Sequence, residues 1–402
     1  MRKQKFYPQT LIQKTIFTLI IMIIYLIGRG LPLYGIDMSA YRDEAVLATE
    51  DLLSQTIGGD AYKISLFALG ISPYMFSMLL VQIVSACRSS DAKTRTSQKK
   101  MSEYTVIITL IWATVQAYMQ VPDLIYRVPE SELLLAQCVS GLQLVVGAFL
   151  ILWLATRNAK YGIGGQTILI FVNILDSLVS VLKSVPFEEL AIPLAIGIAA
   201  MVGTIILENS EYRIPMQRIS IHNIYSDKNY IALKLNPIGM MPVMFAVAFF
   251  ALPQLITRVI MSLNPGSIKA AWYFENMSLY RPLGVVVYIL ILYFLTILFS
   301  FVFINPRDIT ENLMKSGDSI TNLRVGQQTR AYIRKKVLQL SLLSATFMSI
   351  AIGIPMVLQL QGYVAQEVMT LPSIMMALAG INCNLYRTYI AVRDYDAYVP
   401  FI

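Results

Sequence analysis

Reactive and ionisable side chains are scarce in this chain of 402 residues. It contains one histidine and three cysteines, and only 14% of its residues are charged, whereas 56% are hydrophobic. A single histidine, His222, cannot supply a His-Glu-x-x-His zinc site, and we interpret it as a solvated loop residue. Cys87, Cys138 and Cys383 are far apart and form no C-x-x-C pair, which favours small buried side chains over a metal site or disulfides. We therefore expect no enzymatic activity, no metal and no cofactor.

A glycine-rich stretch at residues 162–165 (GIGG) is a weak candidate for a phosphate site. It follows no predicted strand and lacks the Lys-Ser/Thr pair of a phosphate-binding loop. We predict that it opens a helix instead.

Long apolar runs recur along the sequence. A helix needs about 20 apolar residues to cross a bilayer. We predict an all-α polytopic membrane protein with ten transmembrane segments, at residues 16–33, 58–87, 104–121, 133–155, 165–182, 188–207, 238–256, 282–304, 337–358 and 371–389. The first run is long, begins after Lys14 and lacks a small-residue cleavage site, so we expect no cleavable signal peptide.

The second segment is apolar but is interrupted by residues 70–73 (GISP). Neither 60–69 nor 74–84 is long enough to cross a bilayer alone. Pro73 removes a backbone donor and disfavours a helical conformation at Ser72. Broken backbone at membrane depth is tolerated only where protein buries it or water fills a cavity. The segment therefore predicts a path through the membrane.

The basic residues predict the orientation, because cytoplasmic loops collect lysine and arginine. With both termini in the cytoplasm, 24 of the 32 basic residues fall on the inner side. This bias accounts for the net charge of +8 without a nucleic-acid partner. We expect a multi-pass protein of the plasma membrane.

Asp176, one turn after Asn173, is an acidic residue well within a predicted span. Intramembrane carboxylates are candidates for ion coupling, as in a proton- or sodium-driven carrier. Asp176 lies only seven residues before Lys183, however, so we favour a carboxylate that reaches the outer interface or an aqueous cavity.

Two inner connections, at residues 208–236 and 305–336, are long, basic and rich in hydrogen-bonding residues. The second begins with Asn305-Pro306, which is a helix stop and turn signal. Most connections in compact folds are short, and long ones tend to be functional. We predict that these loops form a docking platform for a cytosolic partner.

The chain resembles the SecY family of protein-conducting channels over nearly its whole length. The loop after the eighth span carries the most specific match. The matching segments are 305–313 (NPRDITENL), 315–317 (KSG), 323–329 (LRVGQQT), 65–74 (SLFALGISPY), 233–236 (LKLN) before Gly239 and Pro242, and 28–37, with Gly28, Pro32 and Gly35-Ile36-Asp37.

Departures from the family pattern point to one branch of it. This chain has Gly164-Gly165-Gln166 where housekeeping members have Gly-Asn-Gly, Tyr212-Arg213 in place of paired arginines, and Val325 in place of a proline. Together with short outer loops and a minimal C-terminus, these departures resemble the accessory SecY of Gram-positive bacteria.

The resemblance implies two five-helix halves, residues 1–183 and 184–402, hinged around 183–189. A short outer helix at about 58–67 would form the plug, and a lateral gate would lie between the second and seventh helices. The residues implied are Ile71, Met75, Ile170 (with Thr167 or Phe171 as alternatives), Met244 and Met376 at the pore ring; Gly59, Tyr62, Ile64 and Phe67 in the plug; Phe76, Gln82 and Leu252 at the lateral gate; and Arg213, Arg324 and Gly326 at the ATPase docking site.

The function implied is passive conduction of an unfolded preprotein across the lipid bilayer. Expected partners are a SecA-type ATPase, of the accessory kind, and small SecE/SecG-like membrane subunits. The accessory branch further implies export of serine-rich, glycosylated adhesins. The alternatives are a housekeeping SecY channel and, from a different class, an ion-coupled secondary transporter of small solutes.

Overall fold

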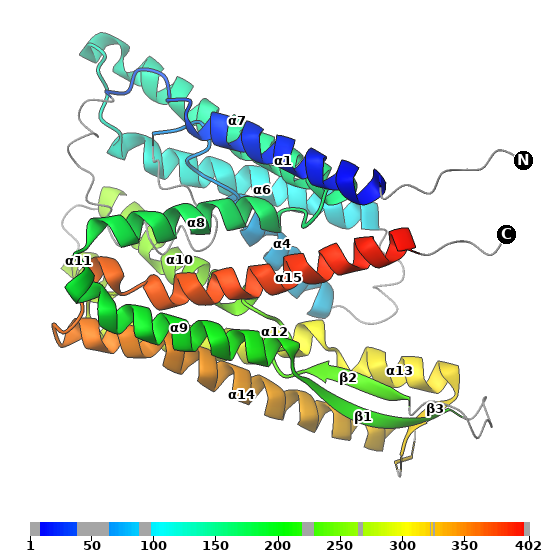
Figure 1. Ribbon diagram of the computed structural model, residues 1–402. Helices are drawn as coiled ribbons and strands as arrows, with labels where there is room; N and C mark the ends of the chain where they lie inside the picture. Colours follow the sequence, from blue (N-terminus) through cyan, green and yellow to red (C-terminus); the bar gives the residue numbers. More distant parts are fainter. Residues whose placement is uncertain are drawn as a thin grey trace, which may run out of the picture. The chain divides into compact units, whose positions relative to one another are not determined.

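The computed structural model describes residues 9–37, 64–87, 98–218, 229–263, 268–321, 323–324 and 326–397 (Figure 1). Long α-helices dominate this part of the chain. The helices are α1 (Gln9–Arg29), α4 (Ser72–Cys87), α6 (Gln98–Gln120), α7 (Leu133–Tyr161), α8 (Thr167–Ser184), α9 (Phe187–Asn209), α10 (Met241–Leu263), α11 (Ile268–Asn276), α12 (Pro282–Phe303), α13 (Pro306–Ser316), α14 (Gln327–Leu360) and α15 (Leu371–Ala397). Short 3-10 turns cover Val121–Asp123, Glu130–Glu132 and Gln366–Val368.

Each predicted span overlaps one of the long helices, which confirms the all-helical class. Among the described residues of the second span, α4 begins at Ser72; residues 64–71 form turns and the bridge at Ser65, and Pro73 lies in the first turn of the helix. By length and composition, five helices of the described residues could cross a membrane: those at Leu11–Arg29, Glu130–Tyr161, Glu189–Asn209, Pro282–Ser316 and Gln327–Leu360. The count of ten crossings stays a prediction.

The chain forms two compact units and passes from the first to the second after Phe187. In the first unit, α7 packs against both α1 and α6, and α1 also contacts α8. One core cluster of this unit joins α6 and α7 to Ala68 and Leu69, which precede α4. The predicted halves, 1–183 and 184–402, stay a prediction; α4 and α15 each contribute residues to both units.

The second unit contains α9 to α14. Helix α12 packs against both α10 and α14, and α11 contacts α10 and α12. A small sheet of order β2-β1-β3 is built from β1 (Glu211–Arg218), β2 (Tyr230–Lys234) and β3 (Asp318–Ile320). Both strand pairs are antiparallel, with Arg213 opposite Ala232 and Gln217 opposite Ser319.

The described residues of the two long connections, 208–236 and 305–336, therefore include folded elements rather than loops alone. The Asn305 side chain caps α13 by accepting a hydrogen bond from the Arg307 backbone N–H at 3.1 Å, and Gly317 ends that helix with a φ of 72°. The apolar faces of the sheet, of α13 and of the start of α14 share one core cluster that includes Ile214, Leu313 and Ile333. We call this assembly of β1, β2, β3, α13 and the first turns of α14 the platform.

Candidate functional site

The five residues expected at the pore constriction are all buried. Ile71, Met75 and Ile170 belong to the first unit, and Met244 and Met376 to the second. The Met75 N–H donates to the Ile71 carbonyl at 3.1 Å, so these two side chains lie one helical turn apart. The alternatives Thr167 and Phe171 are less buried than Ile170. Burial suits a constriction and an ordinary core equally, so the ring stays a prediction.

Of the residues expected at the lateral gate, Phe76 has a clear environment. Its ring stacks on Trp112 of α6, with the ring centroids 4.2 Å apart and an angle of 21° between the planes. Gln82 lies in α4 and Leu252 in α10. Phe76 therefore packs within the first unit, and a gating role stays a prediction.

The segment before α4 is tied to the chain that follows α1. Gly59 and Tyr62 of the predicted plug lie outside the described residues, whereas Ile64 and Phe67 lie in turns. Ser65 forms an antiparallel bridge with Pro32. The flanking bonds run from the Leu33 N–H to the Ile64 carbonyl and from the Leu66 N–H to the Leu31 carbonyl, each 2.9 Å long.

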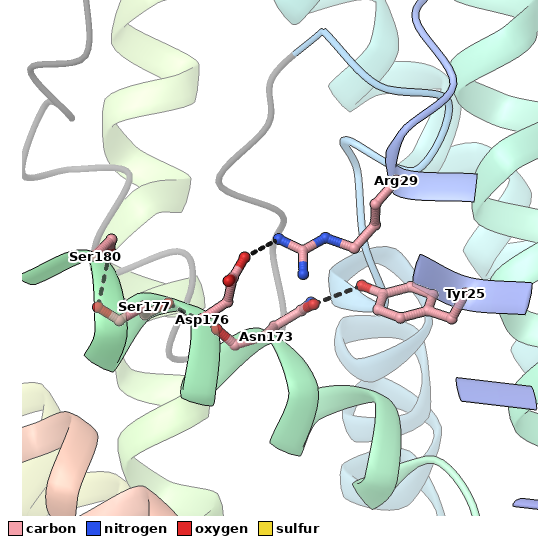
Figure 2. A network of polar contacts seen from close by, with 6 residues as sticks. All are labelled: Tyr25, Arg29, Asn173, Asp176, Ser177 and Ser180. Carbon is pink, nitrogen blue, oxygen red and sulfur yellow. Dashed lines mark hydrogen bonds and ion pairs between the residues drawn. The ribbon is translucent and has the colours of Figure 1, made fainter. Parts of the chain in front are cut away.

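A polar network joins α1 to α8 at the level of this segment (Figure 2). The Tyr25 hydroxyl donates to Asn173 Oδ1 at 2.7 Å, and an Arg29 guanidinium nitrogen lies 2.6 Å from Asp176 Oδ2. The Arg29 side chain is only 6% exposed, whereas that of Asp176 is 43% exposed. The Ser177 hydroxyl extends the network by donating to the Asn173 carbonyl.

The ion pair revises the sequence-based interpretation of Asp176. Its carboxylate is half-exposed, as expected of a group that reaches water, but it also pairs with a buried arginine. Sequence reasoning missed the partner because Arg29 is 147 residues away and counted only as an outer basic charge. The sequence did contain a signal for this pair, since Arg29 and Asp176 each lie near the end of a predicted span that was expected on the outer side.

The glycine-rich stretch at 162–165 was predicted to open a helix; it lies in the connection from α7 to α8, just before α8 begins at Thr167. Asn158 of α7 holds it by donating from Nδ2 to the carbonyls of Ile163 and Gly165, at 3.0 and 2.8 Å. Thr18 of α1 donates to Asn158 Oδ1 and accepts a bond from the Ile163 N–H. These bonds satisfy the buried Asn158 amide and fix the backbone that leads into α8. The role of the stretch is therefore structural.

The platform exposes a cationic and aromatic surface. Arg213 on β1 is 63% exposed, and its guanidinium carbon lies 4.6 Å from the centroid of the Tyr230 ring on β2. Its Nε also lies 4.0 Å from Glu211 Oε2. A guanidinium stacked on an aromatic ring is pre-organised for a carboxylate partner.

A second group on the platform couples a lysine to two tyrosines. Lys336 Nζ lies 4.7 Å from the ring centroid of Tyr212 and 5.8 Å from that of Tyr332. A hydrogen bond from Lys336, followed by one from Tyr332, lowers the pKa of Tyr212. The bond to Tyr212 likewise raises the pKa of Lys336, so this side chain stays positively charged at neutral pH.

The remaining predicted docking residues lie just before α14. Arg324 is exposed, and its carbonyl accepts a hydrogen bond from the buried Thr329 hydroxyl at 2.9 Å. Gly326 caps α14 with a φ of 120°, which side chains other than glycine rarely adopt. The backbone of this turn is therefore fixed while the Arg324 side chain is free to meet a partner surface.

In the part of the chain that the structure describes, no three His, Cys, Asp or Glu side chains gather as metal ligands would. Cys138 is exposed and Cys383 is partly exposed, so neither is the fully buried side chain expected from the sequence. The exposure of each cysteine depends on the face of the helix on which it lies, and the residue type alone does not predict that face. His222 lies outside the described residues.

Comparison with known proteins identifies the family. A family model described as SecY matches residues 65–381. The accessory Sec system protein translocase subunit SecY2 of Streptococcus agalactiae is 32% identical over 401 residues, covering 96% of this chain and 95% of the relative. The protein of the same name from Leuconostoc gelidum subsp. gasicomitatum is 29% identical over 368 residues, covering 86% of each chain.

The fold matches as well. A solved structure described as "The structure of a protein conducting channel" superposes with a TM-score of 0.68 at 16% identity, covering 98% of this chain and 95% of that one. The family model spans most of the sequence, and the resemblance seen in the loop motifs is confirmed. The chain therefore belongs to the SecY family of multi-pass membrane proteins.

Proposed function

We propose that this chain is the central, polypeptide-conducting subunit of an accessory export translocon in the plasma membrane. Relatives that match it over most of its length carry the accessory SecY2 name, and the matching solved structure is of a protein-conducting channel. The chain itself is passive, and a SecA-type ATPase drives the preprotein through it. Small SecE/SecG-like subunits complete the assembly, and both termini are cytoplasmic.

The platform is the observation that carries the ATPase proposal. Strand β1 pairs with β2 on one side and β3 on the other, so the two long inner connections form one folded surface. That surface displays Arg213 beside Tyr230, and exposed Arg324 precedes α14. Rigid cationic groups on a preformed sheet suit acidic patches on a soluble partner.

The client we propose is a serine-rich, glycosylated adhesin. The similarity to accessory SecY2 proteins supports this client. The alternative within the family is a housekeeping channel. An ion-coupled carrier is less favoured, because the Asp176 carboxylate is engaged with Arg29 and, in the part of the chain that the structure describes, belongs to no group of three or more acidic, histidine or cysteine side chains.

The test is reconstitution. Vesicles containing this chain, its small subunits and the cognate accessory ATPase should protect an adhesin preprotein from added protease only when ATP is present. The housekeeping ATPase should support much less protection. Uptake of small solutes driven by a proton or sodium gradient, without protection of preprotein, would contradict the proposal.

A further inference from the structure

We propose that residues 64–67 are a fixed anchor for the segment that precedes them, and that the Arg29–Asp176 ion pair positions this anchor. The inference rests on the proposed function, because it concerns how a closed channel holds its seal. Under this proposal, Ile64 and Phe67, which were expected to belong to the plug, lie in a part of the chain that does not move when the channel opens.

Three kinds of contact hold the anchor. The bridge between Pro32 and Ser65 supplies backbone hydrogen bonds on both sides, and Ser65 is 2% exposed. The Leu66 carbonyl packs so closely on Gly147 of α7 that a β-carbon there would collide with it. The next residues, Ala68 and Leu69, lie in the core formed with α6 and α7. A segment held by a bridge, a close backbone contact and a core is stable against local opening.

The polar network of Figure 2 reaches the anchor through one aromatic ring. The Phe67 ring stacks on the Tyr25 ring, with centroids 5.7 Å apart and planes 11° from parallel. Tyr25 and Arg29 are one helical turn apart on α1, and Asn173 and Asp176 are one turn apart on α8. Two parallel contacts, Tyr25 to Asn173 and Arg29 to Asp176, therefore fix the rotation of α1 and the position of the ring on which Phe67 lies.

The ion pair is the contact of this network that is most direct to test by substitution, because its acidic partner is half-exposed. The Arg29 side chain is buried, and its guanidinium carbon also lies 6.0 Å from the centroid of the Tyr25 ring. Removing the carboxylate takes one charged partner away from a largely buried cation, which weakens the hold on the position of the Arg29 side chain. A movement of Arg29 carries Tyr25 with it and loosens the surface under Phe67.

The first experiment tests whether the anchor moves. In a background with Cys87, Cys138 and Cys383 replaced by serine, Pro32→Cys and Ser65→Cys are combined. Directly opposed residues of this antiparallel type have Cα atoms about 4.5 Å apart, which suits a disulfide. We expect export to be the same with the disulfide formed or reduced. Export that fails on oxidation and returns on reduction would overturn the proposal, because it would make these residues part of the moving plug.

The second experiment tests the ion pair. In reconstituted vesicles without ATPase, Asp176→Asn should raise the resting ion flux about tenfold, whereas Asp176→Glu should raise it little. The disulfide formed by the Pro32→Cys and Ser65→Cys substitutions should return the Asp176→Asn channel to low flux. Glu275→Gln, which removes the exposed pair with Arg281 at 2.7 Å, is the matched control and should leave the flux unchanged.

The outcomes are separable. An unchanged flux in an inserted Asp176→Asn channel, or a raised flux that the disulfide does not lower, overturns the positioning role. If Asp176→Asn does not insert, Tyr25→Phe and Tyr25→Leu provide the test: the leucine variant, which loses the ring stack, should leak more, and equal flux overturns the role. Failure of the unmodified chain to export any preprotein would instead contradict the proposed function.

Discussion

The guanidinium of Arg213 lies over the ring of Tyr230 across the β1–β2 pair, 4.6 Å from its centroid. A flat guanidinium can stack on the ring and still offer hydrogen bonds at its edge, which an ammonium does not reproduce. The contact therefore links the fold of the platform to its expected use as a docking surface.

Arg213→Lys should weaken binding of the accessory ATPase by about tenfold, because the charge is kept while the stacked fork is lost. Tyr230→Leu should have a similar effect, since it removes the ring that orients the guanidinium. Binding to vesicles that contain the channel measures both. Arg393→Lys, an exposed change on α15 and outside the platform, is the control. Wild-type affinity in both test variants would rule out this contact as part of the docking site.

Arg324→Glu should abolish export while the channel still inserts normally. The residue is exposed, and its backbone is fixed by the bond from Thr329, so charge reversal should alter the surface without unfolding the turn. Export assays and the amount of channel in the membrane are the measurements. Arg393→Glu, an exposed residue of α15 outside the platform, is the matched charge reversal and should export far better. Normal export by Arg324→Glu would remove the residue from the docking site.

Deletion of residues 60–63 should produce a channel that inserts but leaks ions at rest. These residues lie outside the described part of the chain, and the deletion spares Ile64, whose carbonyl bonds to the Leu33 N–H. A dry apolar constriction conducts ions poorly, and a plug raises that barrier further. Single-channel conductance in planar bilayers measures the leak. No added conductance would mean that the segment seals nothing.

Replacing Met75, Met244 and Met376 together with isoleucine should preserve closure but slow export of a bulky, glycan-bearing client. Methionine is unbranched and refits around varied neighbours, whereas isoleucine is stiff at its first torsion. Export rates of a glycosylated adhesin and of a slim unmodified preprotein are compared. Equal slowing of both, or of neither, would show that the methionines do not adapt the pore to its cargo.

Gly147→Ala should destabilise the protein by about 1–3 kcal/mol, because the added methyl meets the Leu66 carbonyl and forces the backbone apart. Gly141→Ala is the matched control on the same helix, since its methyl meets only Val121 Cγ2 at 3.4 Å. Melting in detergent with a thiol-reactive dye compares the two. A Gly147→Ala protein that melts with the wild type would mean that residues 64–67 pack less tightly than described.

The membrane helices could be predicted because a bilayer demands long apolar runs, and such runs are visible without knowing any contact. The start of α14 could not, since the ten residues from Gln327 are mostly polar or basic and only the later part of the helix is a continuous apolar run. The sheet was missed for a related reason: β1 carries a proline and several charged residues, and it gains its buried Ile214 only by packing on α13 and α14.

The resemblance carried the functional assignment, and the chemistry of single residues carried little of it. Motifs around Asn305 and Arg324 pointed to the family, which the comparison confirmed. The contacts that are particular to this chain depend on pairs far apart in sequence, such as Thr18 with Asn158 and Arg29 with Asp176. Neither periodicity nor composition reports such pairs.

Helix α14 is continuous from Gln327 to Leu360, and at 1.5 Å per residue its 34 residues extend about 51 Å. The hydrocarbon layer is only about 30 Å thick. The first turns of this helix are built into the platform through Ile333 and Val337, so the helix that we expect to cross the bilayer also carries the surface on which we expect the ATPase to dock. In the orientation that we propose, a tilt imposed on the platform end would be carried along the helix as a lever arm as far as Pro355, a proline inside the helix five residues before its end, where a kink is expected.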